Sequence, residues 1–108
     1  MDGNGAEQRV FDRINVRFSA RLNKRNSAEG VDVIIKDFSP TGARVLASQK
    51  VTLFDRLSLS FSPSKDSSVV MDGHVVYIDK DNPDSWHVGI KFDDVDLLRA
   101  NRIMDLCQ

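Results

Sequence analysis

Apolar and polar side chains alternate along most of this chain, with the two-residue period of β-strands that have one buried face. The clearest case is the segment 14–22, where every even position is apolar and every odd position is polar. Gly73 predicts a β-bulge in a longer strand. Short strands separated by turn-forming residues are typical of a barrel or a sandwich. Six segments are predicted to be strands: residues 14–22, 31–38, 43–48, 56–62, 69–79 and 86–92.

The end of the chain changes to a helical period. Asp93 or Asp94 is the expected N-cap, and Asp96 is expected in the first turn. A helix with one apolar face would pack against the barrel. The apolar positions that define this face are Leu97, Ala100, Met104 and Cys107.

The segment 9–25 also fits a second pattern, because an arginine recurs at every fourth residue and apolar residues between them form a helical face. A basic amphipathic helix is therefore an alternative to the strand. Like charges at that spacing destabilise a helix by about 0.2–0.5 kcal/mol per pair. A strand over 14–22 also buries Val16 and Ala20, which a helix would leave exposed, so we favour the strand.

Composition limits the classes of protein to which the chain can belong. A chain of 108 residues is expected to form one domain that folds without a disulfide or a structural metal. The formal net charge of −1 argues against a surface for polyanions, so any anion site must be local. The single cysteine, Cys107, suits a reducing compartment, and no apolar run is long enough for a membrane span. These features predict a cytoplasmic protein that does not insert into a membrane.

Two arginines before the first predicted strand, Arg9 and Arg13, are candidates for binding an anionic nucleotide. A guanidinium is a planar fork of donors that matches phosphate oxygens or the O6 and N7 edge of guanine, and its flat face can stack on a base. Taken alone, the two arginines also fit an ordinary solvated surface.

A second group of polar residues follows the strand 31–38, in the sequence DFSPTG at 37–42. The Asp37 carboxylate can accept two hydrogen bonds and suits the N1 and amino donors of guanine. Ser39 places a hydroxyl beside it, and Gly42 allows a positive φ and a close approach of the backbone to a ligand. Taken alone, this sequence also fits a type I β-turn with proline at its second position.

The order of these motifs resembles the PilZ domain family. Arg9-x-x-x-Arg13 comes first, Asp37-x-Ser39-x-x-Gly42 follows, and Val88-Gly89-Ile90-Lys91-Phe92 precedes the helix, so the resemblance runs from about Gln8 onward. It implies an all-β fold, a six-stranded antiparallel β-barrel with a C-terminal α-helix, and a receptor for the bacterial second messenger cyclic di-GMP. We expect a flexible N-terminal arm over residues 1–8 and the barrel domain over 9–108.

The resemblance also implies roles for individual residues. Thr41 stands where many relatives have a second glycine, which should change the turn. In the family, the residue before the first arginine, here Gln8, influences whether one messenger molecule or a stacked pair binds. Arg44 either adds a cation at the rim of the site or belongs to the ordinary strand surface. The residues implied to contact the messenger are Arg9, Arg13, Asp37, Ser39 and Gly42.

No enzyme signature competes with this interpretation. His74 and His87 lack metal-ligand spacing, and Cys107 has no assigned base. The acidic stretch 79–84 lacks the glycine and the distal glutamate of a calcium loop. We therefore expect no catalytic residue, no metal and no cofactor other than the bound messenger.

The expected partner is an unidentified downstream protein that reads a rearrangement of the N-terminal arm. Two other functions remain open. One is a small barrel that binds single-stranded nucleic acid, which the near-neutral charge disfavours. The other is an adaptor that binds a protein without any ligand.

Overall fold

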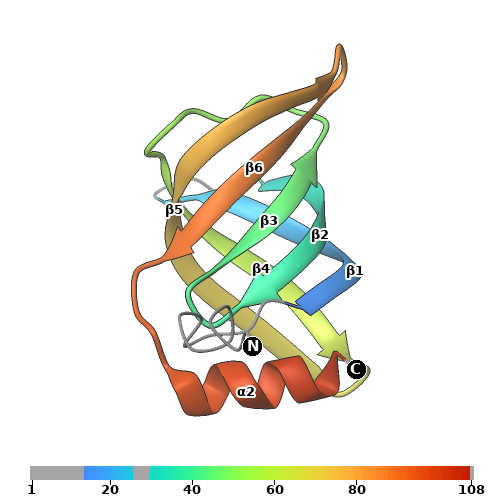
Figure 1. Ribbon diagram of the computed structural model, residues 1–108, viewed down its shortest axis with the longest axis vertical. Coiled ribbons are helices and arrows are strands. Elements are labelled where there is room, and N and C mark those ends of the chain that lie inside the picture. Colours follow the sequence, from blue (N-terminus) through green and yellow to red (C-terminus); the bar gives the residue numbers. More distant parts are fainter. Residues whose placement is uncertain (1–13, 26–29, 108) are drawn as a thin grey trace, which may run out of the picture.

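The computed structural model describes residues 14–25 and 30–107, which form a closed antiparallel barrel and one helix (Figure 1). The strands follow the order β1-β2-β3-β6-β5-β4 around the barrel. This confirms the predicted six-stranded barrel with a C-terminal helix. The elements are β1 (Ile14–Lys24), β2 (Gly30–Ser39), β3 (Gly42–Ala47), β4 (Arg56–Ser64), β5 (Ser67–Asn82), β6 (Ser85–Phe92) and α2 (Leu97–Leu106).

Strand β1 decides between the two interpretations of the start of the chain. Exposed side chains alternate along it with buried or half-buried ones. It forms hydrogen-bonded ladders with β2 on one side and β4 on the other, which closes the barrel. The helical alternative is therefore wrong from Ile14 onward, because the backbone N–H and C=O groups of β1 form hydrogen bonds with the two neighbouring strands and not within a helix. Arg9 and Arg13 lie outside the described residues.

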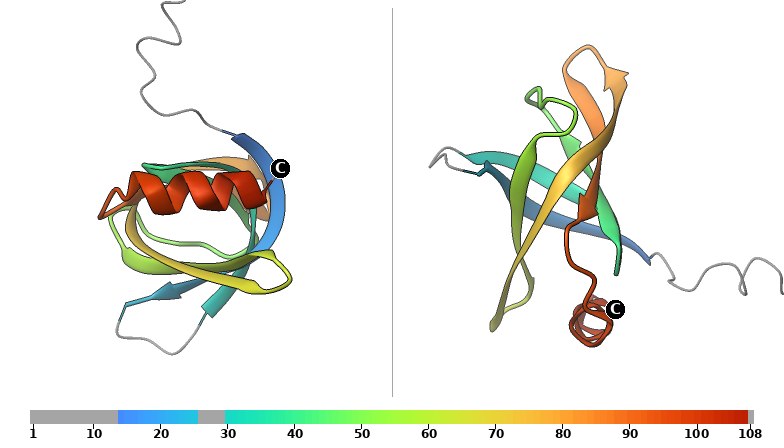
Figure 2. Two further views of the ribbon diagram at one scale, coloured as in Figure 1. Left: turned by 90° about the horizontal axis from the view of Figure 1, so that it is seen from below. Right: turned by 90° about the vertical axis from the view of Figure 1, so that its left-hand side faces the viewer.

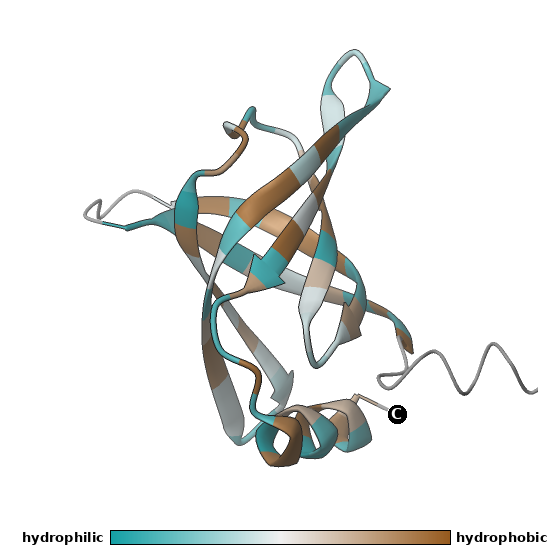
Figure 3. Cartoon of the chain, turned by 60° about the vertical axis from the view of Figure 1, so that its left-hand side comes forward, coloured by the Kyte–Doolittle hydropathy of each residue, from teal (hydrophilic) through white to brown (hydrophobic). Residues whose placement is uncertain are grey.

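The inward-facing residues of all six strands form one core, and the same alternation is visible as bands of hydropathy along the strands (Figure 3). Phe38 lies at its centre, with its ring 5.7 Å from that of Phe61 and 5.5 Å from that of Phe92, measured between centroids. Aromatic pairs of this kind contribute about 0.5–1.5 kcal/mol beyond the area they bury. The end of β2 is therefore anchored in the core.

Helix α2 lies across one end of the barrel, as the view along the barrel shows (Figure 2). It buries Ala100, Ile103 and Met104. Its N-cap is Asp96, whose carboxylate accepts a hydrogen bond from the Arg99 backbone N–H at 3.0 Å. The expected caps at Asp93 and Asp94 are wrong, because these residues form the connection from β6 to the end of the barrel, before the helix begins. No helix among the described residues is long and apolar enough to cross a bilayer.

Strand β5 has irregularities, but none lies at Gly73. Gly73 pairs in register with Leu57 on β4 and with Phe92 on β6. The register with β6 shifts instead between Val75 and Tyr77 and again between Lys80 and Asn82. Glycine is required at position 73 for a different reason: a Cβ there would meet the carbonyl oxygen of Lys91.

Candidate functional site

The β2–β3 hairpin carries the second predicted motif. Asp37 and Ser39 end strand β2, and Gly42 begins strand β3. Asp37 and Ser39 are the buried polar residues of the described chain, with 4% and 3% of their surface exposed. A buried carboxylate is costly unless it is paired and hydrogen-bonded, so its partners indicate what the hairpin does.

A bulge at Lys36 decides which way Asp37 points. The β2–β3 register pairs Ile35 with Val45 and Asp37 with Arg44, so Lys36 is an extra residue on β2. Ile35 and Phe38 both lie in the core, although residues three apart face opposite sides of a regular strand. The bulge therefore moves Asp37 from the core face to the outer face, beside Arg44.

On the outer face Asp37 forms an ion pair with Arg44 across the two strands. The Arg44 Nε lies 3.0 Å from the Asp37 Oδ2. The Asp37 side chain is 5% exposed, whereas that of Arg44 is 39% exposed. Among the described residues Nε has no hydrogen-bond partner, so the contact is an ion pair and not a hydrogen bond. The guanidinium of Arg44 therefore compensates part of the charge of Asp37 and is partly open to solvent.

Ser39 stabilises the turn of the hairpin. Its hydroxyl donates to the carbonyl oxygen of Gly42 at 3.3 Å and accepts from the backbone N–H of Thr41 at 3.3 Å. The Ser39 Oγ also lies 3.1 Å from the Thr41 Oγ1. Thr41, where relatives often have glycine, thus adds a hydroxyl contact within the turn. The turn interpretation of this motif is correct for Ser39.

Gly42 does not use the conformational freedom that we expected of it. Among the described glycines none has a positive φ, so Gly42 does not adopt the left-handed backbone that glycine allows. A Cβ at this position would meet the carbonyl oxygen of Ile90 on β6. Glycine is needed here because β3 and β6 approach closely, which no pattern within the motif could reveal.

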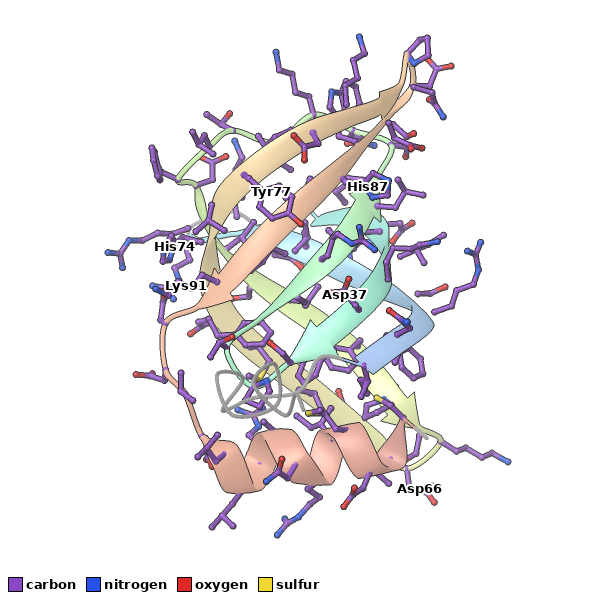
Figure 4. All side chains as sticks on the ribbon, viewed as in Figure 1. Asp37, Asp66, His74, Tyr77, His87 and Lys91 are labelled. Carbon is purple, nitrogen blue, oxygen red and sulfur yellow. The ribbon has the colours of Figure 1, made fainter. Side chains whose placement is uncertain are left out.

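A row of residues extends from Asp37 across the outer face of the barrel. Asp37 pairs with Arg44, Arg44 with Gly89, and Gly89 with Tyr77. A Cβ at Gly89 would meet the Tyr77 ring, so this ring lies over the glycine. Figure 4 labels Asp37 and Tyr77 at the two ends of the row. Sequence reasoning missed Tyr77, although an outward-facing glycine in β6 was a signal that a neighbouring side chain covers it.

The family model of the PilZ domain matches residues 7–108 of this chain. The chain belongs to the PilZ domain family. No curated protein matches its sequence. Several solved structures share the fold at low sequence identity, and their coverage of this chain agrees with the extent of the family match.

Three of these structures show how far the similarity extends. The PilZ domain of YcgR from Escherichia coli with c-di-GMP has a TM-score of 0.72 at 12% identity, covering 93% of this chain and 88% of that one. The PilZ domain of CeSA from a cellulose-synthesizing bacterium has a TM-score of 0.64 at 12% identity, covering 89% and 94%. The Bacillus subtilis inhibitor of motility MotI/DgrA has a TM-score of 0.69 at 11% identity, covering 92% of this chain and 49% of that one. This PilZ chain thus spans about half the length of MotI/DgrA.

A second charged cluster of this PilZ domain lies around Asp93, in the link between β6 and α2. The Arg25 guanidinium lies 2.6 Å from the Asp93 Oδ2, and the His74 Nδ1 lies 3.2 Å from its Oδ1. The pKa of Asp93 is lowered, chiefly by the hydrogen bond with His74. Burial opposes this effect, and the hydrogen bond and charge of Arg25 lower the pKa further. The cluster joins the end of β1 to the start of the helical segment.

The histidines of the PilZ domain pair with carboxylates. His87 Nε2 lies 3.2 Å from the Asp81 Oδ1, as His74 pairs with Asp93. Within residues 14–25 and 30–107, no group of three or more such side chains could hold a metal ion. Burial raises the pKa of the Cys107 thiol, which disfavours a reactive thiolate.

Two of the cavities in the described part of the chain lie beside β2 and β3. One of about 200 Å³ is lined by Thr41 and Gly42 of the hairpin and by Tyr77 and Lys91 of β5 and β6. The other, of about 500 Å³, lies over β1, β2 and β3, and its described lining does not include the motif residues. The first cavity is thus the one that adjoins the motif.

Proposed function

We propose that this PilZ domain is a receptor for cyclic di-GMP, bound on the outer face of the β2–β3 hairpin. The observation that carries the proposal is the buried carboxylate of Asp37, which a bulge directs outward against Arg44. The fold supports it, since this barrel resembles that of the YcgR PilZ domain with c-di-GMP. A bulge that re-aims a buried charge is a feature typical of binding sites.

The chemistry of the hairpin suits a guanine nucleotide. A carboxylate accepts the two adjacent donors of guanine, N1–H and the amino group. Arg44 keeps a cation beside that carboxylate, where it can also reach a phosphate. Ser39 and Gly42 contribute indirectly, because the first stabilises the turn and the second lets β3 approach β6. The Tyr77 ring at the far end of the row offers a face on which a base can stack.

The arginine motif can reach this site from the start of β1. Asn15 pairs with Asp37, and covalent geometry keeps the Cα atom of Arg13 within about 7 Å of that of Asn15. The corresponding limit for Arg9 is about 20 Å. Arg9 and Arg13 would supply bidentate donors for the phosphates and one guanine, and Gln8 would influence the number of ligand molecules bound.

The receptor would pass on the signal through the N-terminal arm. Residues 1–8, outside the described part of the chain, would form that arm, and the barrel domain would cover 9–108. Binding of the messenger to both Arg13 and Asp37 would tie the arm to the hairpin, at a cost in ordering entropy. A downstream protein would then recognise the changed surface. The domain would act as a binding module and not as an enzyme.

Titration calorimetry on the full chain tests the site. We expect Arg9→Ala, Arg13→Ala and Asp37→Ala each to weaken cyclic di-GMP binding at least about tenfold, since each removes charge-assisted hydrogen bonds. Arg21→Ala is the matched control, because Arg21 on β1 pairs with Asp32 on the exposed surface. Undiminished affinity in all three site variants would contradict the proposal.

The identity of the ligand can be tested separately by thermal shift with GMP, GTP, cyclic AMP and cyclic di-GMP. We expect stabilisation by cyclic di-GMP alone, because a ligand that binds only the folded state raises its stability. Binding to single-stranded nucleic acid that falls steeply with salt would instead support the nucleic-acid alternative.

A further inference from the structure

One side of the barrel carries two groups of exposed residues whose chemistry is complementary. The first group, the basic zone, combines apolar side chains with two cations on β4, β5, β6 and the loop before β4. The second, the acidic zone, combines apolar side chains with carboxylates at the start of α2. The basic zone consists of Leu53, Phe54, Arg56, Val76 and Lys91, and the acidic zone of Asp94, Val95, Asp96, Leu97 and Leu98.

The loop of the basic zone holds an aromatic ring out in solvent. Phe54 is 70% exposed and has a φ of 70°, which is costly for a bulky side chain. Backbone hydrogen bonds nevertheless hold this loop against β5. The Phe54 N–H donates to the Val75 carbonyl oxygen at 2.9 Å, and the Val75 N–H donates to that of Asp55 at 3.0 Å. Such a strained and exposed aromatic side chain, next to the exposed Val76, is typical of an interface anchor.

The two cations of the basic zone lack acidic partners among the described residues. Arg56 and Lys91 flank His74 on neighbouring strands. The nearby carboxylates are engaged elsewhere: Asp93 with Arg25 and His74, and Asp72 with Arg25 and Ser58. The apolar surface around Phe54 is therefore bordered by uncompensated positive charge.

The acidic zone has the opposite character. Leu98 in the first turn of α2 is 81% exposed, and Val95 in the link before the helix is 50% exposed. Asp94 is exposed and forms no ion pair with the described residues, and Asp96 caps the helix. Apolar side chains bordered by carboxylates are what the basic zone would bind.

The two zones lie toward opposite ends of one side of the molecule, the left side in Figure 1, which faces the viewer in the right-hand view of Figure 2. Lys91, labelled with His74 on this side in Figure 4, is the residue of the basic zone that is nearest in sequence to Asp94 of the acidic zone. A two-fold axis between Lys91 and Asp94 would place each zone of one copy on the other zone of a second copy. Each favourable contact would then be made twice.

We propose that this side of the barrel binds a second copy of the chain, with the basic zone of each protomer on the acidic zone of its partner. The dimer forms without the messenger, although Val76 and Lys91 of the basic zone also line the cavity beside the ligand motif. Burial of Phe54 and Leu98 supplies the apolar contact, and the charges fix the relative orientation of the two copies.

Sedimentation equilibrium of the full chain over a concentration series tests this dimer. We expect the natural chain to show a monomer–dimer equilibrium. Phe54→Ser, Lys91→Glu and Asp94→Lys should each raise the dissociation constant at least about tenfold, because each removes the anchor or juxtaposes like charges twice. Matched controls are Lys65→Glu and Asp66→Lys in the β4–β5 turn, away from both zones, where Figure 4 labels Asp66.

A mixture of two variants gives the sharpest test. Lys91→Glu and Asp94→Lys alone should be monomeric, but an equal mixture should dimerise, since each position 91 then faces an opposite charge at position 94 of the other chain. The two-fold symmetry requires this result.

Three outcomes would overturn the proposal. The natural chain could remain monomeric up to about 1 mM, which would leave the two zones to a different protein. It could dimerise with no sensitivity to the three substitutions, or the mixture could stay monomeric. Circular dichroism of each variant confirms that a loss of dimer is not a loss of fold.

Discussion

Two arginine–aspartate pairs lie on different regions of this PilZ domain, and they differ in burial more than in distance. The pair Arg25–Asp93 is the shorter, at 2.6 Å against 3.0 Å for Arg44–Asp37. The Asp93 side chain is 27% exposed, whereas that of Asp37 is 5% exposed. Exposed pairs contribute little to stability, because water screens them. The length of the ion pair therefore does not identify the candidate site. The burial of its aspartate does.

The backbone around the two pairs shows the same contrast. Asp37 reaches its arginine only because of the bulge at Lys36, and a glycine keeps its hairpin close to β6. Asp93 follows the end of β6 in a segment that simply passes to the helix. The hairpin thus needs a bulge and a close approach to β6 to hold the Asp37 carboxylate in place, whereas the link holds the Asp93 carboxylate without either feature. The following predictions test this difference, from the largest expected effect to the smallest.

The largest effect is expected from Gly42→Ala, which should destabilise the barrel by about 2–4 kcal/mol, because the added Cβ meets the Ile90 carbonyl oxygen. Urea unfolding measures this loss. If the variant instead keeps its stability, the close approach of β3 and β6 is not what requires glycine here.

Asp37→Asn should weaken cyclic di-GMP binding at least about tenfold, since an amide cannot accept both guanine donors. Asp93→Asn is the matched control in the other region, and its affinity should stay within about twofold. Calorimetry on the two variants measures the difference. Equal losses would mean that burial does not distinguish the two pairs.

Tyr77→Ala should weaken messenger binding by about 1 kcal/mol if a base stacks on the ring, because stacking of a base on an aromatic side chain contributes at least about that much to binding. Tyr77→Phe, which keeps the ring, should bind like the natural chain. A loss in both variants would point to the hydroxyl and would contradict stacking.

The smallest effect concerns pH. The pKa of Asp93 is lowered from its usual value of 3.8, so its pairing stabilises the folded state above that pH. This contribution is lost as the pH falls through the lowered pKa of the folded protein. The stability difference between the natural chain and Asp93→Asn should therefore shrink in urea titrations carried out at progressively lower pH. A difference that is independent of pH would show that the pair has no electrostatic role.

Much of the fold could be predicted because alternation is a local property. The strand over 14–22 follows from which positions are apolar, whereas the pattern left a barrel and a sandwich open and the resemblance to the PilZ family implied the barrel. The helix face was predicted in part: Ala100 and Met104 are buried, but Leu97 is 44% exposed at the overhanging start of α2. The sequence also identified Asp37 as a candidate. For its partner Arg44 the sequence allowed two interpretations, a cation at the rim of the site or ordinary strand surface, because no local pattern shows that the two side chains meet.

The sequence by itself determined the strands, their inward faces and the chemical groups available for a ligand. Only the tertiary structure decided that Asp37 faces outward and that Gly42 lies against β6. The physical reason is that a bulge is set by the register between neighbouring strands, and one extra residue reverses the face of every side chain beyond it. The successive polar residues Lys36 and Asp37 interrupt the alternation of β2, but only the pairing with β3 shows that Lys36 is the extra residue and that Asp37 faces outward.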